Sequence, residues 1–527
     1  MGITWGRGVE NTARPPQALW VTLIDPPGDA DGGHQVSRTI PTLVITELST
    51  AVYTECGRKS ETKFVDEPRA EATDLQPGLE GRAGASRHLL RRILSLAIPA
   101  LGALIAEPLF TLIDSAMVGH LGTPQLAALS LASQILQTLV VLFIFLAYST
   151  TSLTARALGA SDKKKALQVG VDASWLALGL GLGGAVLLAW AAPALVDRMT
   201  PDPRVAAHAI AYLRASAPGI VGMLIGFSTV GTLRGLQDTK TPLLVTSLGA
   251  VLNVGLNAAL MYGIGMGVAG SGLGTSIVQL AMAGVYLAIL RAQARKAGVA
   301  LAPSGAGILG ATKEGAPLVL RGLALRAAGL ATIWPVSHIG SEALASYQVV
   351  LATWTLSSFI LDALAIAAQS LVGLAIGRGD RSALKELLRI LTRCGIGAGL
   401  LLGVLIAATS PWTPLLFGSD PAVRSIATIG LLVSCASMPI SAVVFMLDGV
   451  LLGAGDNIFF AKVALVQLAI LMPALAAVEF ARESGAGPAF IVGGAWAAYG
   501  LVYMGARFAF NMHRTWRSPK GPLGISA

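Results

Sequence analysis

The hydrophobic part of this chain occurs twice, and the second copy lies 218 residues after the first. Pro99 recurs as Pro317, and the loop motifs keep the same register. The matching segments are Val118–Gly122 with Val336–Gly340, Gly159 and Asp162 with Gly377 and Asp380, and Gly235 and Asp238 with Gly453 and Asp456. A single register across three separated loops predicts a fold of two like halves. In a membrane protein, such a repeat is typical of transporters.

Composition excludes a water-soluble globule, because 54% of the residues are hydrophobic, 13% are charged and the mean hydropathy is +0.68. From about residue 92, apolar stretches recur that are long enough to cross roughly 30 Å of hydrocarbon as helices. Twelve such spans are predicted: 92–118, 127–154, 168–193, 206–231, 242–264, 268–292, 310–336, 345–372, 389–410, 423–448, 459–480 and 489–511. The expected fold is therefore an all-α integral membrane protein with two lobes of six helices each.

The basic residues of the loops predict the orientation, because Lys and Arg stay on the cytoplasmic side during insertion. Loops that follow even-numbered spans hold fifteen Lys and Arg residues, and loops that follow odd-numbered spans hold four. Both termini are therefore expected in the cytoplasm, and the protein in a bacterial inner membrane. Six helices per half is an even number, so the halves are expected to be related by an axis along the membrane normal. The net charge of +9 fits a basic collar facing anionic lipid and needs no nucleic acid.

Four segments are predicted: a disordered cytoplasmic tail over 1–87, an N-lobe over 88–300, a C-lobe over 306–516 and a cytoplasmic tail over 517–527. The first segment has weak apolar periodicity and many acids, which argues against a transit peptide. A mis-assigned translation start is the alternative for it. Three cysteines without a CxxC motif indicate neither a disulfide framework nor a zinc site.

Energy-coupling and catalytic motifs are absent from the sequence. No phosphate-binding loop for ATP is present, so transport is expected to be secondary. The six histidines form no metal-binding pattern, and His120 and His338 are repeat-related, which favours a structural role in the turn over a role in transport. We therefore expect a monomer in the lipid bilayer that is not an enzyme and uses no cofactor or metal.

Charged residues inside the apolar spans are the candidates for function, because an ionised side chain at mid-bilayer costs at least about 2.5 kcal/mol. Asp114 lies late in the first span, and its repeat partner is Thr332, so the carboxylate is present in one half only. Glu107 lies two turns earlier on the same face and precedes Pro108, which interrupts the helix hydrogen bonding. The two acids are predicted to line one cavity, although acceptance of hydrogen bonds from a neighbouring helix is the alternative role.

The chain resembles the MATE multidrug exporters of the MOP superfamily, and their DinF-like branch in particular, over about residues 88–516. The resemblance rests on EPLFTLIDSAMVGHLGT in the first span, ARALGASDKKKA and RGLQDTKTPLLV in the loops, and LDGVLLGAGD in the tenth span. It implies a twelve-helix antiporter that exports amphipathic compounds, often organic cations, in exchange for protons or sodium ions. It also implies that Asp114 is the coupling carboxylate. A lipid or lipid-linked sugar flippase of the same superfamily is the alternative.

The resemblance also locates a departure in the fifth span. Some members have an Asn and, one turn later, an acid, whereas this chain has Asn253 and Asn257. Without a second carboxylate, a single proton carrier is the simpler scheme. Asn253 and Asn257 are predicted to line the cavity together with Gln134, and interhelical hydrogen bonding is the alternative for the Asn pair.

The second half contains its own ionisable set, which is predicted to form an ion network. Its members are Arg321, Arg326, Asp362 and Asp448. Such residues normally pair with one another or line water. Arg321 and Arg326 stand in the seventh span, where sodium-binding branches of the family place an acid, which lowers the expectation of sodium coupling.

The predicted mechanism is rocker-switch antiport, in which the two lobes alternate access to a central cleft and Asp114 exchanges a proton for substrate. A carboxyl group with apolar surroundings can titrate near neutral pH, so a proton and a cationic substrate can compete for it. Arg321 and Arg326 keep the flippase alternative open. A membrane scaffold or an intramembrane enzyme is the alternative of another class, but the sequence contains no clustered catalytic residues.

Overall fold

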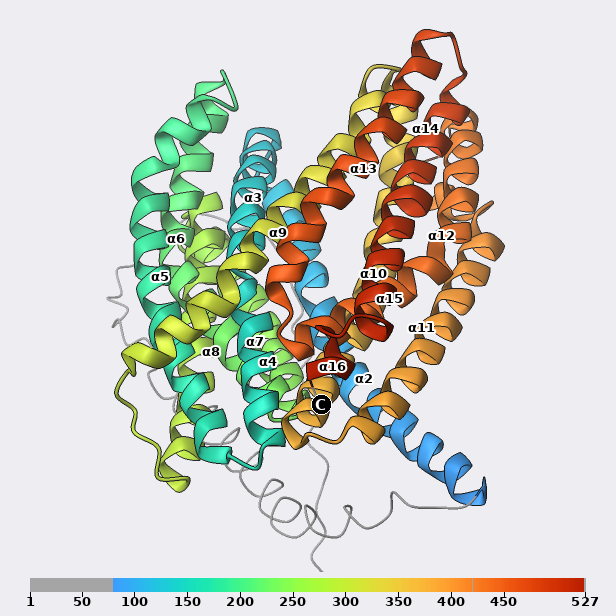
Figure 1. The fold of residues 1–527 in the computed structure, drawn as a ribbon. Coiled ribbons are helices and arrows are strands. Elements are labelled where there is room, and N and C mark those ends of the chain that lie inside the picture. The colour runs from blue at the N-terminus through green and yellow to red at the C-terminus, as the bar shows by residue number, and fades with distance from the viewer. Residues whose placement is uncertain (1–78, 419, 526–527) are drawn as a thin grey trace, which may run out of the picture. The chain divides into compact units, whose positions relative to one another are not determined.

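The computed structural model describes residues 79–418 and 420–525, and in these ranges the chain is helical without strands. The elements are α2 (Leu79–Gly119), α3 (Thr123–Phe143), α4 (Phe145–Gly159), α5 (Lys163–Asp197), α6 (Pro203–Gly235), α7 (Lys240–Ala258), η1 (Ala259–Gly263), α8 (Val268–Lys296), α9 (Gly305–Ser337), α10 (Ser341–Arg378), α11 (Arg381–Thr409), η2 (Thr413–Leu416), α12 (Pro421–Ala454), α13 (Asn457–Glu483), α14 (Pro488–Ala497), η3 (Ala498–Tyr503), α15 (Met504–Trp516) and α16 (Pro522–Ile525). Figure 1 shows their arrangement.

Among the described residues, twelve helices are long and apolar enough to cross a membrane, which confirms the predicted number of spans. Three spans are composite. The second joins α3 and α4 around Ile144, the fifth joins α7 and η1, and the twelfth joins α14, η3 and α15. α2 begins at Leu79 and so extends into the predicted tail, whose residues 1–78 lie outside the described part of the chain.

Repeat-related aspartates begin the third and ninth spans. Asp162 accepts a hydrogen bond from the backbone N–H of Lys165, and Asp380 accepts one from Ala383. Each carboxylate thereby caps the N-terminus of its helix, where backbone N–H groups have no partner within the helix. The hydrogen bond donated by the backbone N–H of Ala383 is the largest cause that lowers the pKa of the Asp380 carboxyl group, and the Ser382 hydroxyl lowers this pKa further. The sequence repeat therefore encodes equivalent helix starts in both lobes.

Small residues let the helices of each lobe approach closely at equivalent places. A Cβ atom added to Gly231 of α6 would lie 2.6 Å from the carbonyl oxygen of Ala147 in α4. The equivalent Gly449 of α12 would place its Cβ 2.2 Å from the carbonyl oxygen of Ala365 in α10. Since association in lipid depends on close packing of backbones, these repeated contacts confirm that the two lobes have the same internal construction.

The two lobes meet at the end of the molecule where the basic loops lie. We call this the basic end and define it by the loops Ala160–Asp162, Leu236–Thr239, Gly379–Asp380 and Gly455–Asp456. The hydrogen bonds that join the lobes nearby include those from Ser152 Oγ to the Gly453 carbonyl, from Ser370 Oγ to the Arg234 carbonyl, and from Gln369 Nε2 to the Tyr148 carbonyl. The residues at 152 and 370 are repeat partners, so this interface is built from equivalent parts of the two halves.

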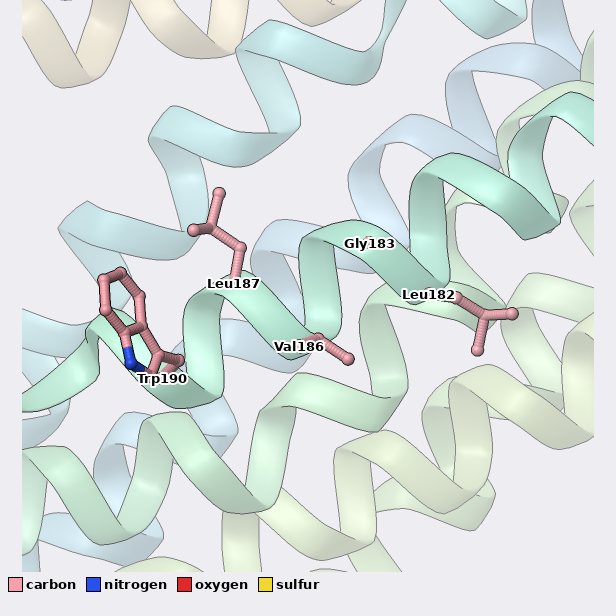
Figure 2. A pocket seen from close by; sticks show the side chains of 5 residues that line it. All are labelled: Leu182, Gly183, Val186, Leu187 and Trp190. Atoms are coloured by element: carbon pink, nitrogen blue, oxygen red, sulfur yellow. The ribbon is translucent and has the colours of Figure 1, made fainter.

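A shallow apolar depression of about 440 Å³ lies on α5 and is a poor candidate for a functional site. Figure 2 shows its lining by Leu182, Gly183, Val186, Leu187 and Trp190, which follow one another along a single helix. The four side chains are more than half exposed. Binding sites combine an apolar wall with a few polar groups that orient the ligand, and the indole N–H of the exposed Trp190 is the one polar side-chain group in this lining. This surface is suited to contact with lipid chains.

Candidate functional site

Asp114 lies on α2 with only 5% of its surface exposed, and polar groups from two other helices surround it. Its Oδ1 accepts hydrogen bonds from Asn257 Nδ2 on α7, at 2.9 Å, and from Ser271 Oγ on α8, at 2.7 Å. Tyr212 of α6 also lies close to the carboxyl group. Within the described part of the chain, no cationic side chain pairs with Asp114. The site is therefore a buried carboxyl group held by neutral donors.

A close packing contact at Gly274 and a hydrogen bond from Tyr262 fix the helices around Asp114. A Cβ atom on Gly274 would lie 2.0 Å from Asn257 Oδ1, so only a glycine leaves room for the amide at this place. Tyr262 Oη, in the π-helical segment η1, donates to the Met117 carbonyl at 2.5 Å and ties the end of the fifth span to α2. Short π-helical segments often occur at functional sites. A change at Asp114 can thus reach α2, α7 and α8 together.

Of the other residues predicted to line this cavity, Asn253 and Gln134 form their hydrogen bonds with residues other than Asp114. Asn253 Nδ2 donates to Thr275 Oγ1 at 3.2 Å and makes no hydrogen bond to the acid. Gln134 of α3 contacts Arg326 of the other lobe. Glu107 lies in α2, and its side chain is outside the described residues. Ser271 was not predicted as a partner of Asp114, although a serine at the apolar start of the sixth span indicates a buried polar contact.

The equivalent place in the C-lobe lacks these polar groups. Thr332 replaces Asp114, and its hydroxyl donates to the Ala328 carbonyl of its own helix at 2.8 Å. Asn253 and Asn257 correspond to Leu471 and Leu475, both buried. The carboxyl site is therefore a property of one lobe, as the one-sided sequence pattern at Asp114 indicated.

The C-lobe contains a separate charge cluster around Asp448 of α12. Arg321 of α9 donates to Asp448 Oδ2 at 2.5 Å, Arg507 of α15 donates to the same oxygen, and Asn511 Nδ2 donates to Oδ1 at 2.7 Å. The Arg321 and Arg507 guanidinium groups also lie over the rings of Phe460 and Tyr503, respectively. Their side chains are 11% and 6% exposed. Asp448 is thus a buried anion compensated by two cations.

This cluster differs in membership from the predicted ion network. Arg321 and Asp448 pair, whereas Arg326 extends toward the N-lobe and has Gln134 as its partner. Asp362 of α10 lies within electrostatic range of Arg321, Asp448 and Arg507, but it forms no ion pair within the described part of the chain. Arg507 and Asn511 were missed, although both lie inside the predicted twelfth span, where a charged residue is itself a signal.

Unlike the Asp448 cluster, which lies within the C-lobe, the ion pair between Arg156 and Glu314 joins the two lobes at the basic end. Arg156 Nη2 of α4 lies 2.8 Å from Glu314 Oε1 of α9, and Asn457 Nδ2 of α13 donates to Glu314 Oε2 at 2.8 Å. Arg156 also donates to the Ala454 carbonyl at 3.4 Å. Glu314 therefore bridges one side chain of the N-lobe and one of the C-lobe. The repeat gave no sign of this contact, because the equivalent of Glu314 is Leu96.

Two further observations bear on the predictions. His120 Nδ1 bonds to the Ala116 carbonyl and His338 Nδ1 to the Trp334 carbonyl, so the two histidines occupy equivalent helix ends, which supports their structural role. Among the described residues, no group of three or more His, Cys, Asp or Glu side chains is arranged to hold a metal ion.

Comparisons with known proteins agree with this architecture. The family model MatE matches residues 99–259 and 317–478, which are the two halves of the repeat. The chain is 32% identical to Protein DETOXIFICATION 44, chloroplastic, of Arabidopsis thaliana over 381 residues, or 69% of this chain and 72% of that protein. It is 27% identical to DNA damage-inducible protein F of Escherichia coli, over 68% and 79% of the two chains. A solved MOP superfamily transporter from Pyrococcus furiosus has a TM-score of 0.71 at 21% identity, covering 80% of this chain and 94% of its own.

Proposed function

Because the chain belongs to the MatE family, we propose that it is a secondary active antiporter that exports amphipathic organic compounds in exchange for protons. The observation that supports this most is Asp114, a buried carboxyl group with neutral partners in an apolar span. An uncompensated buried charge is costly. A proton removes that cost, so the group is suited to alternate between a charged and a neutral form.

Protonation changes what Asp114 can bind. An ionised carboxylate only accepts hydrogen bonds, whereas a protonated one also donates. Its partners Asn257 and Ser271 belong to α7 and α8, so a change of protonation alters the contacts of α2 with both helices. Since Asp114 is only 5% exposed, we propose that substrate and proton compete through the packing of the N-lobe and not by contact with the same carboxylate.

The other acids are less suited to carry the proton. Asp448 is already held by Arg321 and Arg507 in ion pairs within the C-lobe. The Asn at 257 supplies no second carboxylate beside Asp114, so a two-acid cation site is not formed there. These features favour protons over sodium ions as the coupling ion.

Alternating access requires the lobes to separate at one end and close at the other. In this structure they are joined at the basic end by Arg156 and Glu314 and by the close approach of Gly159 and Gly377. From the excess of Lys and Arg in these loops we propose that this end, with both chain termini, faces the cytoplasm. The conformation is then the one closed to the cytoplasm, and opening requires the Arg156–Glu314 pair to break.

Transport by everted membrane vesicles tests the proposal. A proton gradient or, separately, a sodium gradient is imposed across the membrane of vesicles that contain the protein. The movement of cationic, uncharged and anionic amphipathic dyes is then followed by fluorescence. We expect dye movement that depends on the proton gradient and is lost in Asp114→Asn. Movement driven equally by sodium alone, or unchanged in Asp114→Asn, would contradict it.

A further inference from the structure

The face of α9 that contacts the N-lobe changes from tight packing to open space along its length. Gly315, Gly322 and Gly329 are seven residues apart and share this face. A Cβ atom on Gly315 would lie 2.2 Å from the Phe145 ring, and one on Gly322 would lie 3.2 Å from the Val141 carbonyl oxygen. A Cβ atom on Gly329 would meet nothing within 4 Å. α9 therefore separates from α3 and α4 between Gly322 and Gly329.

Two polar side chains face each other where the separation begins. Arg326 of α9 lies between the last two of these glycines, and its Nη2 is 3.4 Å from Oε1 of Gln134 on α3. Gln134 precedes Val141 by two turns, so the two helices run in opposite directions past this point. One member of the pair belongs to each lobe, and the opening therefore has a polar group on both sides.

Arg326 differs from Arg321, Arg507 and Arg156 in its compensation. Asp448 neutralises Arg321 and Arg507, and Glu314 neutralises Arg156. Among the described residues, the partner of Arg326 is the neutral Gln134, at a long hydrogen-bond distance and within an apolar span. Asp114 of the N-lobe is enclosed by its own lobe. A cation held in such surroundings is stabilised by an anion that enters the opening.

An apolar pocket between α9 and α13 lies one turn further along α9. Leu330 follows Arg326 by four residues, which places both side chains on one face. Together with residues of α13, it lines a pocket of about 500 Å³, a size that holds a drug-sized apolar group. The lining residues are Leu330, Ala331, Trp334, Pro335, Met472, Leu475, Ala476 and Glu479. The one acid among them, Glu479, is paired with Arg482 at 2.7 Å.

From this arrangement we propose that the opening between α3 and α9 binds the anionic group of an amphipathic substrate. Arg326 pairs with a carboxylate, sulfonate or phosphate, Gln134 donates a hydrogen bond to it from the other lobe, and the apolar body lies toward Leu330 and Trp334. The inference deepens the proposed transport function, since it names the substrate class. It also gives the opening a polarity opposite to the one expected for exporters of organic cations.

Equilibrium binding to the full chain in nanodiscs of zwitterionic lipid tests the inference with three probes of one fluorophore: dansylglycine (anionic), dansylamide (uncharged) and dansylcholine (cationic). Dansylglycine is expected to bind the wild type at least about tenfold more tightly than dansylcholine, since a charge-assisted hydrogen bond contributes about 1.5–3 kcal/mol. Arg326→Gln should weaken the binding of dansylglycine about tenfold and leave the affinity for dansylamide unchanged. Arg214→Gln, which removes an exposed arginine of α6, is the matched control and should change neither.

Two results would overturn the inference: tighter binding of dansylcholine than of dansylglycine by the wild type, or unchanged dansylglycine binding in Arg326→Gln. The binding measurement is repeated in nanodiscs that contain phosphatidylglycerol, to distinguish a lipid phosphate from a water-soluble anion as the ligand of Arg326. Displacement of dansylglycine assigns the site to a lipid phosphate and so to a flippase, and retained binding assigns it to a water-soluble anion. Asp114→Asn is expected to keep dansylglycine binding, so failure of the proton-coupling proposal would leave this measurement unaffected.

Discussion

Gly159 and Gly377 occupy equivalent positions in the two halves of the chain, and they pack against each other across the boundary between the lobes. A Cβ atom on Gly159 would lie 2.9 Å from the Gly377 Cα and 2.2 Å from the Leu374 carbonyl oxygen. The next turn repeats the pattern, since a Cβ on Gly373 would lie 2.8 Å from the Cβ of its repeat partner Ala155. Equivalent residues meet in this way only beside the axis that relates two lobes. The axis therefore passes through the basic end.

We predict that Gly159→Leu opens the basic end, because the new side chain would collide with backbone atoms that cannot move aside. The measurement is the distance between spin labels at Lys164 and Lys385, one on each lobe, in a cysteine-free background. The variant should show a longer distance than the wild type. Gly179→Leu, at a glycine of α5 with open space around it, is the control and should leave the distance unchanged. An unchanged distance in Gly159→Leu would show that this contact does not hold the lobes together.

The ion pair at the basic end should contribute to the same closed conformation. Arg156 and Glu314 are 26% and 24% exposed, so the pair is only partly screened by water. Glu314→Gln should populate the opened state more, by about 1 kcal/mol or roughly fivefold. Glu386→Gln, which removes an exposed pair with Arg389, is the control and should have no such effect. Additive effects of Arg156→Gln and Glu314→Gln in a double-mutant cycle would contradict coupling between them.

The Asp448 cluster should act mainly on stability. Asp448→Asn leaves two buried guanidinium groups without an anion, and breaking a buried pair costs about 3–5 kcal/mol. We expect a clear fall in the thermal unfolding temperature in detergent, and partial recovery when Arg321→Gln is added. Arg326→Gln should unfold like the wild type, because in the part of the chain that the structure describes Arg326 contacts Gln134 and forms no ion pair with an acid. Equal destabilisation by Arg321→Gln and Arg326→Gln, or no recovery in the double variant, would contradict this description of the cluster.

The donors to Asp114 should modulate transport without replacing the carboxylate. Asn257→Ala and Ser271→Ala each remove one hydrogen bond to Oδ1, and a buried group that loses its partner costs about 1–3 kcal/mol. Both variants should therefore exchange more slowly than the wild type but still respond to the proton gradient. Asn253→Ala removes only the bond to Thr275 and serves as control. Complete loss of exchange by Asn257→Ala with intact folding would assign that residue a larger role.

Sequence reasoning located the features that depend on one helix or one repeat. The hydropathy pattern predicted twelve spans, the repeat predicted two like lobes, and the asymmetry at Thr332 indicated that Asp114 is special. Contacts between distant helices could not be read from spacing. Arg321 had two acids available, and only the three-dimensional structure shows that it pairs with Asp448 of α12, to which Arg507 of α15 also binds.

The contacts between the lobes were the least predictable. The repeat relates residues within each lobe, but it does not say which side chains meet across the boundary. Glu314 and Arg326 correspond to Leu96 and Pro108, so neither residue has a charged equivalent that would indicate its partner. The bridge to Arg156 and the contact with Gln134 therefore emerge only from the arrangement of α9 against α3 and α4.

Proton movement coupled to substrate is the most direct test of the central role of Asp114. Proteoliposomes are prepared with the pH dye pyranine inside, and the amphipathic dye that wild-type vesicles export fastest is added outside under a proton gradient. Wild-type protein should show substrate-dependent proton flux, and Asp114→Asn should show none while unfolding at the same temperature. Asp172→Asn, at another buried acid of the N-lobe, is the matched control and should retain the flux. Substrate-dependent proton flux of wild-type size in Asp114→Asn would contradict the account.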